Sequence, residues 1–236
     1  MAKLILRKLH WKVLTLSALA LFLSALPTSE VFSQEDDRDR LDMMMINLNS
    51  SFLLGSKGLF DQKFFSHGYD IALMYDHFLP RSPMSVGIGL GISHMRIYSN
   101  AQVEWVDSNE TNFHLFNVIP FDSTYKRSAF NLNYLEIPAE LRYRSKPDER
   151  GHPWKISIGA KVGFKINARQ LLVDDQAYRF TSTRFPNTAR VRGTATFRVG
   201  YGKFSIYGAY QFTPLFHEGQ GTELYPLSIG MCLSLF

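Results

Sequence analysis

Cysteine is nearly absent from this sequence, because the 236 residues contain one, Cys232. A single cysteine forms no disulfide within the chain, which excludes a small scaffold held together by disulfide bonds. Cys232 stands near the carboxyl end of an alternating apolar segment, where we expect a small buried or lipid-facing residue rather than a reactive thiol. The seven histidines show no spacing, with cysteine or with each other, that is typical of a zinc site. The sequence therefore predicts no metal site and no cofactor.

Long hydrophobic runs are missing from the chain after residues 1–33. Within that segment, four Lys or Arg residues precede the apolar stretch Val13–Leu26, which is short for a membrane-spanning helix. Val31–Ser33 supplies tolerated residues before a cleavage point at Gln34. We predict a secretory signal peptide over residues 1–33, followed by a charged periplasmic lead-in over 34–42. No cysteine follows the apolar stretch, so a lipoprotein signal is excluded.

A strong excess of charge is also lacking. The net charge of the whole chain is +5, and removal of residues 1–33 takes away four Lys or Arg and Glu30, which leaves +2. Most of the apparent basicity therefore belongs to the signal peptide. A nucleic-acid partner is not expected, because its binding depends on a concentration of positive charge.

The most regular pattern in the chain is the alternation over Trp154–Arg169, where every second residue is apolar. This period sorts the side chains onto the two faces of a β-strand, whereas a helix would mix them. The segment exceeds the roughly 9–11 residues with which a tilted strand crosses a bilayer. Its other face carries glycines and lysines, which suit a narrow wet lumen. A soluble barrel would reverse the two faces, and the period alone does not distinguish the two.

Seven further segments alternate in the same way, and the long and short connections between the segments also alternate. The expected strands are Met43–Leu54, Gly68–Phe78, Met84–Tyr98, Ser128–Arg144, Trp154–Arg169, Arg190–Tyr201, a segment from Phe204 to about Thr213, and Thr222–Phe236. Longer connections on one side and short turns on the other are typical of outer-membrane barrels. The sequence predicts an all-β fold over 43–236, an eight-stranded antiparallel up-and-down transmembrane β-barrel. In the fourth strand the apolar phase changes, which predicts a β-bulge near Asn133-Tyr134.

Charged residues fall on the predicted inner face of four strands. The acids are Asp70, Asp76, Glu136 and Glu140, and the bases are Lys155, Lys161, Lys165, Arg190, Arg192 and Arg198. An eight-stranded barrel is just wide enough for side chains to fill it, and charges there must be paired or hydrated. We expect an ion-pair network that plugs the lumen. A charged conduit or proton path is the alternative.

An enzymatic role is not expected from the sequence. A lipid-modifying barrel enzyme would need a serine and a histidine on one face with an acid behind them. Ser93-His94 is the one adjacent pair inside an expected strand, and its side chains point to opposite faces. The polar segment Ser99–Arg127 contains several aromatic residues, which would either bind a protein partner or cap the mouth of the barrel.

Asn133–Tyr143, with the sequence NYLEIPAELRY, resembles the Y-L-E-[IL]-P-x-x-L-[KR]-Y segment of an outer-membrane β-barrel family of Bacteroidota, whose members are called PorT-like or porin-family proteins. The resemblance implies an outer-membrane location, contact with outer-membrane lipid, and insertion by the barrel assembly machinery. It supplies no catalytic motif. One departure is Phe236, since family barrels commonly end on an outward-facing aromatic residue, whereas Phe236 shares the phase of Ser234 and Cys232.

These observations lead to one main functional hypothesis and two alternatives. The main hypothesis is a non-enzymatic outer-membrane barrel with a filled, charged lumen, whose outer loops interact with a partner or with the cell surface. The alternatives are a narrow porin-like channel and an accessory component of outer-membrane secretion, as PorT-like proteins are. PorT is linked to type IX secretion, and no residue outside the shared segment supports that role here.

Overall fold

The computed structural model describes residues 44–55, 62–80, 82–107, 112–118, 125–183, 185, 187–217, 219 and 221–235. All of them belong to one compact unit, Arg38–Phe236. The expected signal peptide and lead-in lie outside the described residues, as does Phe236. No helix within the described ranges is long and apolar enough to cross a membrane.

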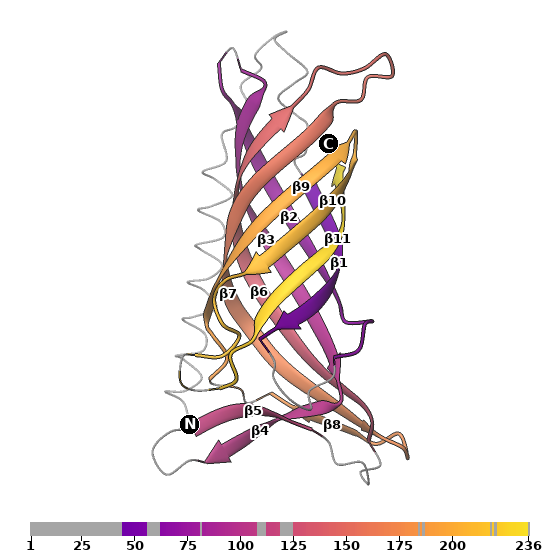
Figure 1. Cartoon of the computed structure of the whole chain (residues 1–236), viewed down its shortest axis with the longest axis vertical. Helices are drawn as coiled ribbons and strands as arrows, with labels where there is room; N and C mark the ends of the chain where they lie inside the picture. Colours follow the sequence, from indigo (N-terminus) through magenta and orange to yellow (C-terminus); the bar gives the residue numbers. More distant parts are fainter. Residues whose placement is uncertain are drawn as a thin grey trace, which may run out of the picture. The chain divides into compact units, whose positions relative to one another are not determined.

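Eight strands form a closed antiparallel barrel (Figure 1). They are β1 Met44–Leu54, β2 His67–Phe78, β3 Met84–Ser99, β6 Tyr125–Arg144, β7 Trp154–Asp174, β9 Val191–Tyr201, β10 Phe204–Gln211 and β11 Tyr225–Leu235. Each pairs with its neighbours along the chain, and β1 pairs with β11 to complete the ring. Closure leaves no exposed sheet edge around the ring, which a membrane-spanning sheet requires. The predicted fold class is confirmed.

Three further strands lie in segments that the alternation left as loops. β4 Ala101–Asp107 and β5 Asn112–Val118 form a separate hairpin within the expected loop Ser99–Arg127. β8 Arg179–Ser182 pairs with the end of β7. The expectation that both connections are irregular is therefore wrong in part. These strands have only seven, seven and four residues, so the sequence pattern there is weak.

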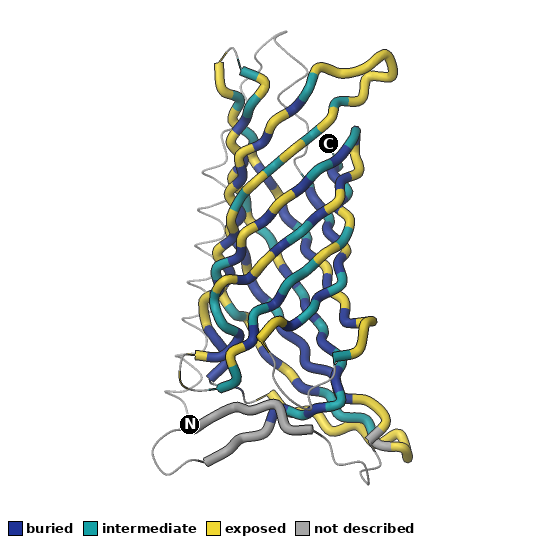
Figure 2. Tube along the Cα trace, in the orientation of Figure 1, coloured by how far each residue is buried: buried dark blue, intermediate teal, exposed yellow. Residues whose placement is uncertain are grey.

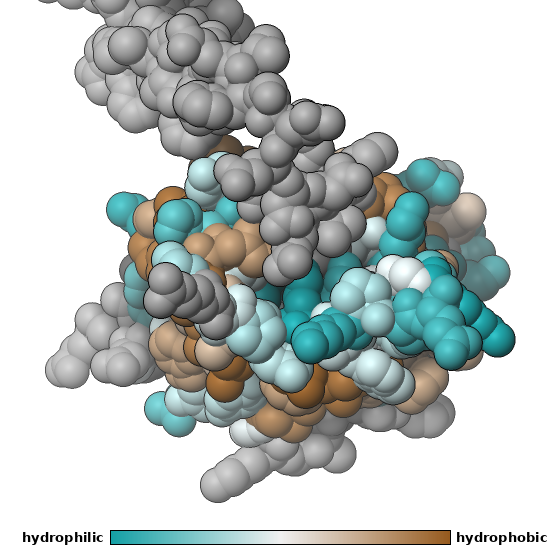
Figure 3. All heavy atoms as spheres, turned by 90° about the horizontal axis from the view of Figure 1, so that it is seen from above, coloured by the Kyte–Doolittle hydropathy of each residue, from teal (hydrophilic) through white to brown (hydrophobic). Residues whose placement is uncertain are grey.

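The apolar face of the barrel strands points outward. The exposed fraction is 62% for Ile158 and 45% for Val162, whereas Lys161 between them is 6% exposed. Buried and exposed residues alternate along the strands in Figure 2. Seen from above, hydrophobic residues lie around the outside of the wall on several sides, and hydrophilic residues gather toward the middle (Figure 3). The soluble alternative, with apolar residues inside, is therefore excluded.

A register shift lies where the sequence predicted a bulge, but the extra residue is on the other strand. Asn133 pairs with Asn167 and Tyr134 pairs with Lys165, which leaves Ile166 of β7 without a partner. Strand β6 keeps one phase against β3 throughout, so Phe130 and Leu132 share the inner face with Glu136. The apparent change of phase in β6 reflects an inner surface that changes from charged to apolar.

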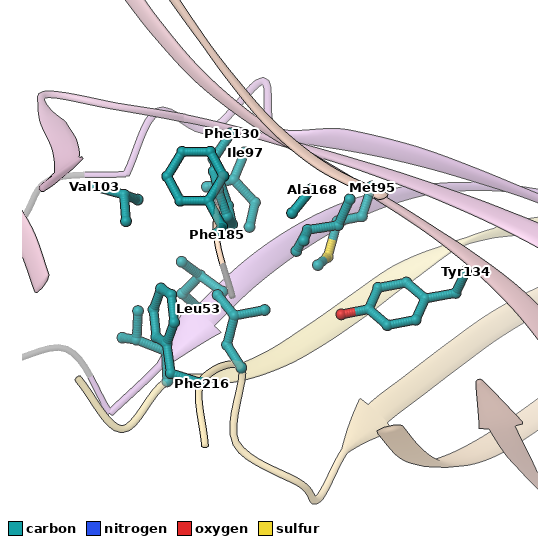
Figure 4. Packing of buried hydrophobic residues seen from close by; sticks show 12 residues of the cluster. Leu53, Met95, Ile97, Val103, Phe130, Tyr134, Ala168, Phe185 and Phe216 are labelled. Atoms are coloured by element: carbon teal, nitrogen blue, oxygen red, sulfur yellow. The ribbon is translucent and has the colours of Figure 1, made fainter. Parts of the chain in front are cut away.

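That apolar inner surface closes the end of the barrel that carries the long connections (Figure 4). The cluster, here called the mouth cluster, consists of Leu53, Met95, Ile97, Val103, Phe130, Leu132, Tyr134, Ala168, Phe185, Leu215, Phe216 and Leu224. Phe185 packs edge-on against Phe130, with ring centroids 5.2 Å apart. The two connections that supply its loop residues are tied together, because Ala189 N–H donates to the carbonyl of Leu215. Cys232 is buried in a second cluster with Met45, Ala72, Met74, Tyr207 and Ala209.

Candidate functional site

The inner face of the barrel below the mouth cluster carries most of the predicted charged residues. Alternation brings them there, since most of them stand between outward apolar residues on β2, β6, β7 or β9. The predicted residues that form ion pairs in the lumen are Asp70, Asp76, Glu136, Glu140, Lys161, Arg192 and Arg198. They form two clusters.

The central cluster contains Asp70, Glu136, Lys161 and Arg192, each from a different strand. The ammonium group of Lys161 lies 3.1 Å from Asp70 Oδ2 and 2.8 Å from Glu136 Oε2. The other carboxylate oxygen of Glu136, Oε1, lies 2.5 Å from Nη2 of Arg192. Two cations and two carboxylates therefore neutralise one another. The cluster links strands β2, β6, β7 and β9 across the lumen.

Neutral side chains complete the surroundings of the central cluster. The guanidinium of Arg192 stacks on the ring of Tyr134 at 3.8 Å and donates to Ser93 Oγ at 2.8 Å. The hydroxyl of Tyr207 donates to Asp70 Oδ2 at 3.3 Å, from the opposite wall. These contacts matter because a buried ion pair is stable only when its remaining donors and acceptors are also satisfied.

The turn-end cluster lies closer to the short turns and contains Asp76, Glu140, Arg142, Arg144 and Arg198. Asp76 accepts from Nη1 of Arg142 at 2.6 Å and from Nη2 of Arg144 at 2.5 Å. Glu140 Oε2 lies 2.8 Å from Nη1 of Arg198 and 3.1 Å from Nε of Arg142. Three cations face two carboxylates here, so the two clusters together carry one positive charge in excess.

Arg142 and Arg144 are members of the network that the sequence analysis missed. The two residues are 3% and 8% exposed. The signal that would have identified them was present, because both stand in the same phase of β6 as Glu136 and Glu140. A basic residue at an inward position near an inward acid on the same strand is expected to join the same ion-pair network.

Three predicted residues take other places. Lys165 is half-buried and its ammonium group donates to the carbonyls of Phe185 at 3.2 Å and Thr188 at 2.7 Å, so it holds a connection over the mouth. Lys155 is half-buried on the inner face next to the turn-end cluster. Arg190 is exposed and does not lie in the lumen, because β9 begins one residue later, at Val191.

Little empty space remains inside the barrel. A cavity of about 30 Å³ lies beside the central cluster and another of about 20 Å³ lies beside the turn-end cluster. Each has room for one or two water molecules. The lumen is therefore occupied by side chains along the two clusters and then by the mouth cluster.

The adjacent Ser93-His94 pair does not come together on one face of the barrel wall. Ser93 is buried on the inner face, whereas His94 points outward, as the alternation predicted. Among these residues, no group of three or more His, Cys, Asp or Glu side chains could hold a metal ion. What the arrangement does chemically is to hold opposite charges at fixed positions between the strands.

A comparison with protein families identifies the fold. The model of a family described as outer membrane protein beta-barrel domain matches residues 45–218, which run from β1 to the connection before β11. No curated protein and no solved structure matches the chain. The match covers most of the chain and agrees with the closed barrel and its apolar outer face. The chain therefore belongs to the outer membrane protein beta-barrel domain family and is an outer-membrane protein.

Proposed function

We propose that this protein is a non-enzymatic, non-conducting outer-membrane barrel whose outer connections form an interaction surface. The observation that carries the proposal is the filled lumen. The turn-end cluster, the central cluster and the mouth cluster follow one another along the barrel interior. Export by the signal peptide 1–33 and insertion by the barrel assembly machinery are parts of the same proposal.

The energetics of the network favour a seal over a channel. Each ion removed from water costs several kcal/mol, and this cost is recovered through the pairing with opposite charges. A permeating ion would have to displace partners such as Lys161 from Glu136, which leaves a buried charge uncompensated. It would then meet Phe185 and Phe216, which are 6% and 1% exposed. A narrow channel is the less favoured alternative for these reasons.

The likeness of Asn133–Tyr143 to PorT-like proteins has a structural explanation that does not require a role in secretion. The residues of that segment that point inward include Tyr134, Glu136 and Glu140, which belong to the lumen network or pack against it. The outward half, with Leu135 and Ile137, faces the lipid. The residues shared with PorT-like proteins therefore support a similar arrangement of side chains in the lumen. An accessory role in secretion stays the second candidate, and the effect of deleting the gene on protein secretion tests it.

Conductance in planar bilayers tests the main proposal. Purified, refolded protein is expected to give no unitary currents under an applied potential. A variant that combines Glu136→Ser, Lys161→Ser and Phe216→Ala serves as the positive control, because it shortens side chains in both the central cluster and the mouth cluster. Steady unitary currents from the unchanged protein would refute the sealed lumen. An altered lipid A mass in an overexpressing strain would refute the absence of enzymatic activity.

A further inference from the structure

The outer face of the barrel changes from apolar to polar along a row of four residues near the long connections. Tyr69, His94, Asn133 and Asn167 are successive cross-strand partners on β2, β3, β6 and β7. Asn133 Oδ1 lies 2.6 Å from His94 Nδ1, and Asn133 Nδ2 donates to Asn167 Oδ1 at 2.6 Å. The rings of Tyr69 and His94 stack at 5.1 Å. The row interrupts the apolar face on these strands.

The length of the apolar face places this row at the membrane surface. On β7 the outward apolar residues run from Trp154 to Ile166, which at roughly 3.3 Å per residue is about 40 Å along the strand. With a strand tilt of about 45°, the height is about 28 Å, close to the ~25 Å apolar band of such barrels. Asn167 follows directly after this run. Residues beyond the row therefore stand at the level of lipid headgroups.

Strands β3, β6 and β7 continue past the row and, with neighbouring segments, form a cleft of about 880 Å³. It is lined by Lys63, Phe65, His67, Arg96, Tyr98, Lys126, Arg127, Ser128, Leu171, Val173, Asp175, Ala177 and Arg179. Most of its strand residues, including Arg96, Arg127 and Val173, hold outward positions, so the cleft opens on the outside of the wall. The long connections mark this end as the external one.

The cleft is strongly basic. Among its described lining residues are five Lys or Arg side chains and a single carboxylate, that of Asp175. Two of the cations are held in place, since Nε of Arg96 donates to Asn131 Oδ1 at 2.5 Å and Arg127 stacks over the ring of Tyr98 at 5.7 Å. Held guanidinium groups suit phosphate, which they bind through two parallel hydrogen bonds. The adjoining Leu171 and Val173 offer an apolar surface beside the charges.

From this geometry we propose that the cleft binds the phosphate groups of an anionic, phosphorylated lipid of the outer leaflet. The charge selects phosphate, the outward opening gives access from the bilayer, and the height matches the headgroup layer. A free phosphate ion would use the charge alone and would gain nothing from the apolar neighbours. The proposal depends on the outer-membrane location and not on whether the lumen conducts.

Titration of purified protein in a neutral detergent tests the proposal, with binding followed by native mass spectrometry. The probes are a bisphosphorylated lipid A, the same lipid after phosphatase treatment, and inorganic phosphate. We expect tight binding of the first, and affinities at least about tenfold lower for the other two. Equal binding of the dephosphorylated lipid would overturn the phosphate assignment. Equal binding of inorganic phosphate would overturn the lipid assignment.

Two double variants locate the site. Arg96→Gln with Arg127→Gln is expected to weaken lipid binding about tenfold or more, because each Lys or Arg near an anionic surface contributes appreciably. Lys126→Gln with Arg179→Gln is expected to weaken lipid binding as well. It alters two exposed side chains, so a loss of folding cannot mimic this weaker binding. The matched control, Lys146→Gln with Arg150→Gln, removes the same charge from the exposed turn at the opposite end. Equal losses in all three variants would overturn the assignment of the cleft.

Discussion

Glu136 connects two cations through its two carboxylate oxygens, and this makes it a sensitive position in the lumen. We expect Glu136→Gln to destabilise the barrel by about 3 kcal/mol, because Lys161 and Arg192 keep their charges and lose their shared partner. Unfolding by urea of the protein in lipid vesicles, followed by tryptophan fluorescence, measures the change. Glu149→Gln removes an exposed carboxylate from a turn and is expected to change stability little.

The coupling within the central cluster can be measured as well. When Lys161→Met is combined with Glu136→Gln, the remaining Asp70 and Arg192 still balance one another. The double variant is therefore expected to lose clearly less stability than the sum of the two single changes. Additive losses would mean that the two residues act independently, in conflict with the 2.8 Å contact between them.

Outside the membrane-spanning part, Asp148 in the turn 145–153 is the residue with the clearest electrostatic signature. The hydroxyl of Tyr201 donates to its Oδ2, and this hydrogen bond, with help from the backbone N–H groups of His152 and Arg150, holds the pKa of Asp148 below its usual range. A carboxyl group whose pKa is lower in the folded state stabilises the fold above its unfolded pKa. That contribution is lost as the pH falls through the folded value.

Tyr201→Phe removes the hydroxyl and is expected to raise the pKa of Asp148 toward its ordinary value. NMR titration of the side-chain carboxyl carbon gives the measurement. Tyr210→Phe, at an exposed tyrosine on β10, is the control and should leave that pKa unchanged. An unchanged pKa in the Tyr201 variant would show that the backbone donors alone hold the carboxylate.

At the level of elements, the bulge in β7 separates two inner surfaces. On one side of Ile166 the inward residues are odd-numbered, such as Lys161, and on the other side they are even-numbered, such as Ala168 and Gln170. Deletion of Ile166 would join Lys165 directly to Asn167, which leaves Ala168 inward and Arg169 outward in a ladder without the bulge. We expect both the deletion variant and Ile166→Val to keep the heat-modifiable gel mobility of a folded barrel. A deletion variant that fails to fold would show that the bulge itself is required.

The sequence was sufficient for the barrel because lipid demands a uniformly apolar outer face over Trp154–Ile166 and its equivalents. It was insufficient to place the bulge, because an apolar residue such as Leu132 can face either the lipid or a covered apolar interior. The short strand β8 was missed because its four residues are too few to show an alternation.

The members of the lumen network were predictable, but their pairing was not. Alternation tells that Asp70 and Lys161 both point inward, and it carries no information on the register between strands far apart in the chain. That register brings Asp70 to Lys161 and Asp76 to Arg142. Lys165 stood in the correct phase, yet its position beside the mouth gave it backbone carbonyls as partners.

For the molecule as a whole, the orientation in the membrane follows from the two kinds of connection. The long connections are expected outside the cell and the short turns in the periplasm. In a Cys232→Ser background, a cysteine at Tyr178 should react with a membrane-impermeant maleimide on intact cells, and a cysteine at Glu149 only after lysis. Both side chains are exposed in the structure, so accessibility to water does not distinguish them. The reverse pattern of labelling would invert the assigned orientation and would move the basic cleft to the inner leaflet.

The ladders between neighbouring strands differ in length around the barrel. The β6–β7 ladder runs from Tyr125 to Arg144, whereas the β10–β11 ladder covers only Phe204 to Tyr210. The β1–β2 ladder, over Met44–Ser50, is equally short, so transient parting of the wall is expected at these two junctions before the β6–β7 junction. In detergent micelles, the amides of Phe204–Tyr210 should exchange with deuterium before those of Leu135–Leu141. If the wall opens between β10 and β11, the opening reaches the side of the lumen without first displacing the mouth cluster.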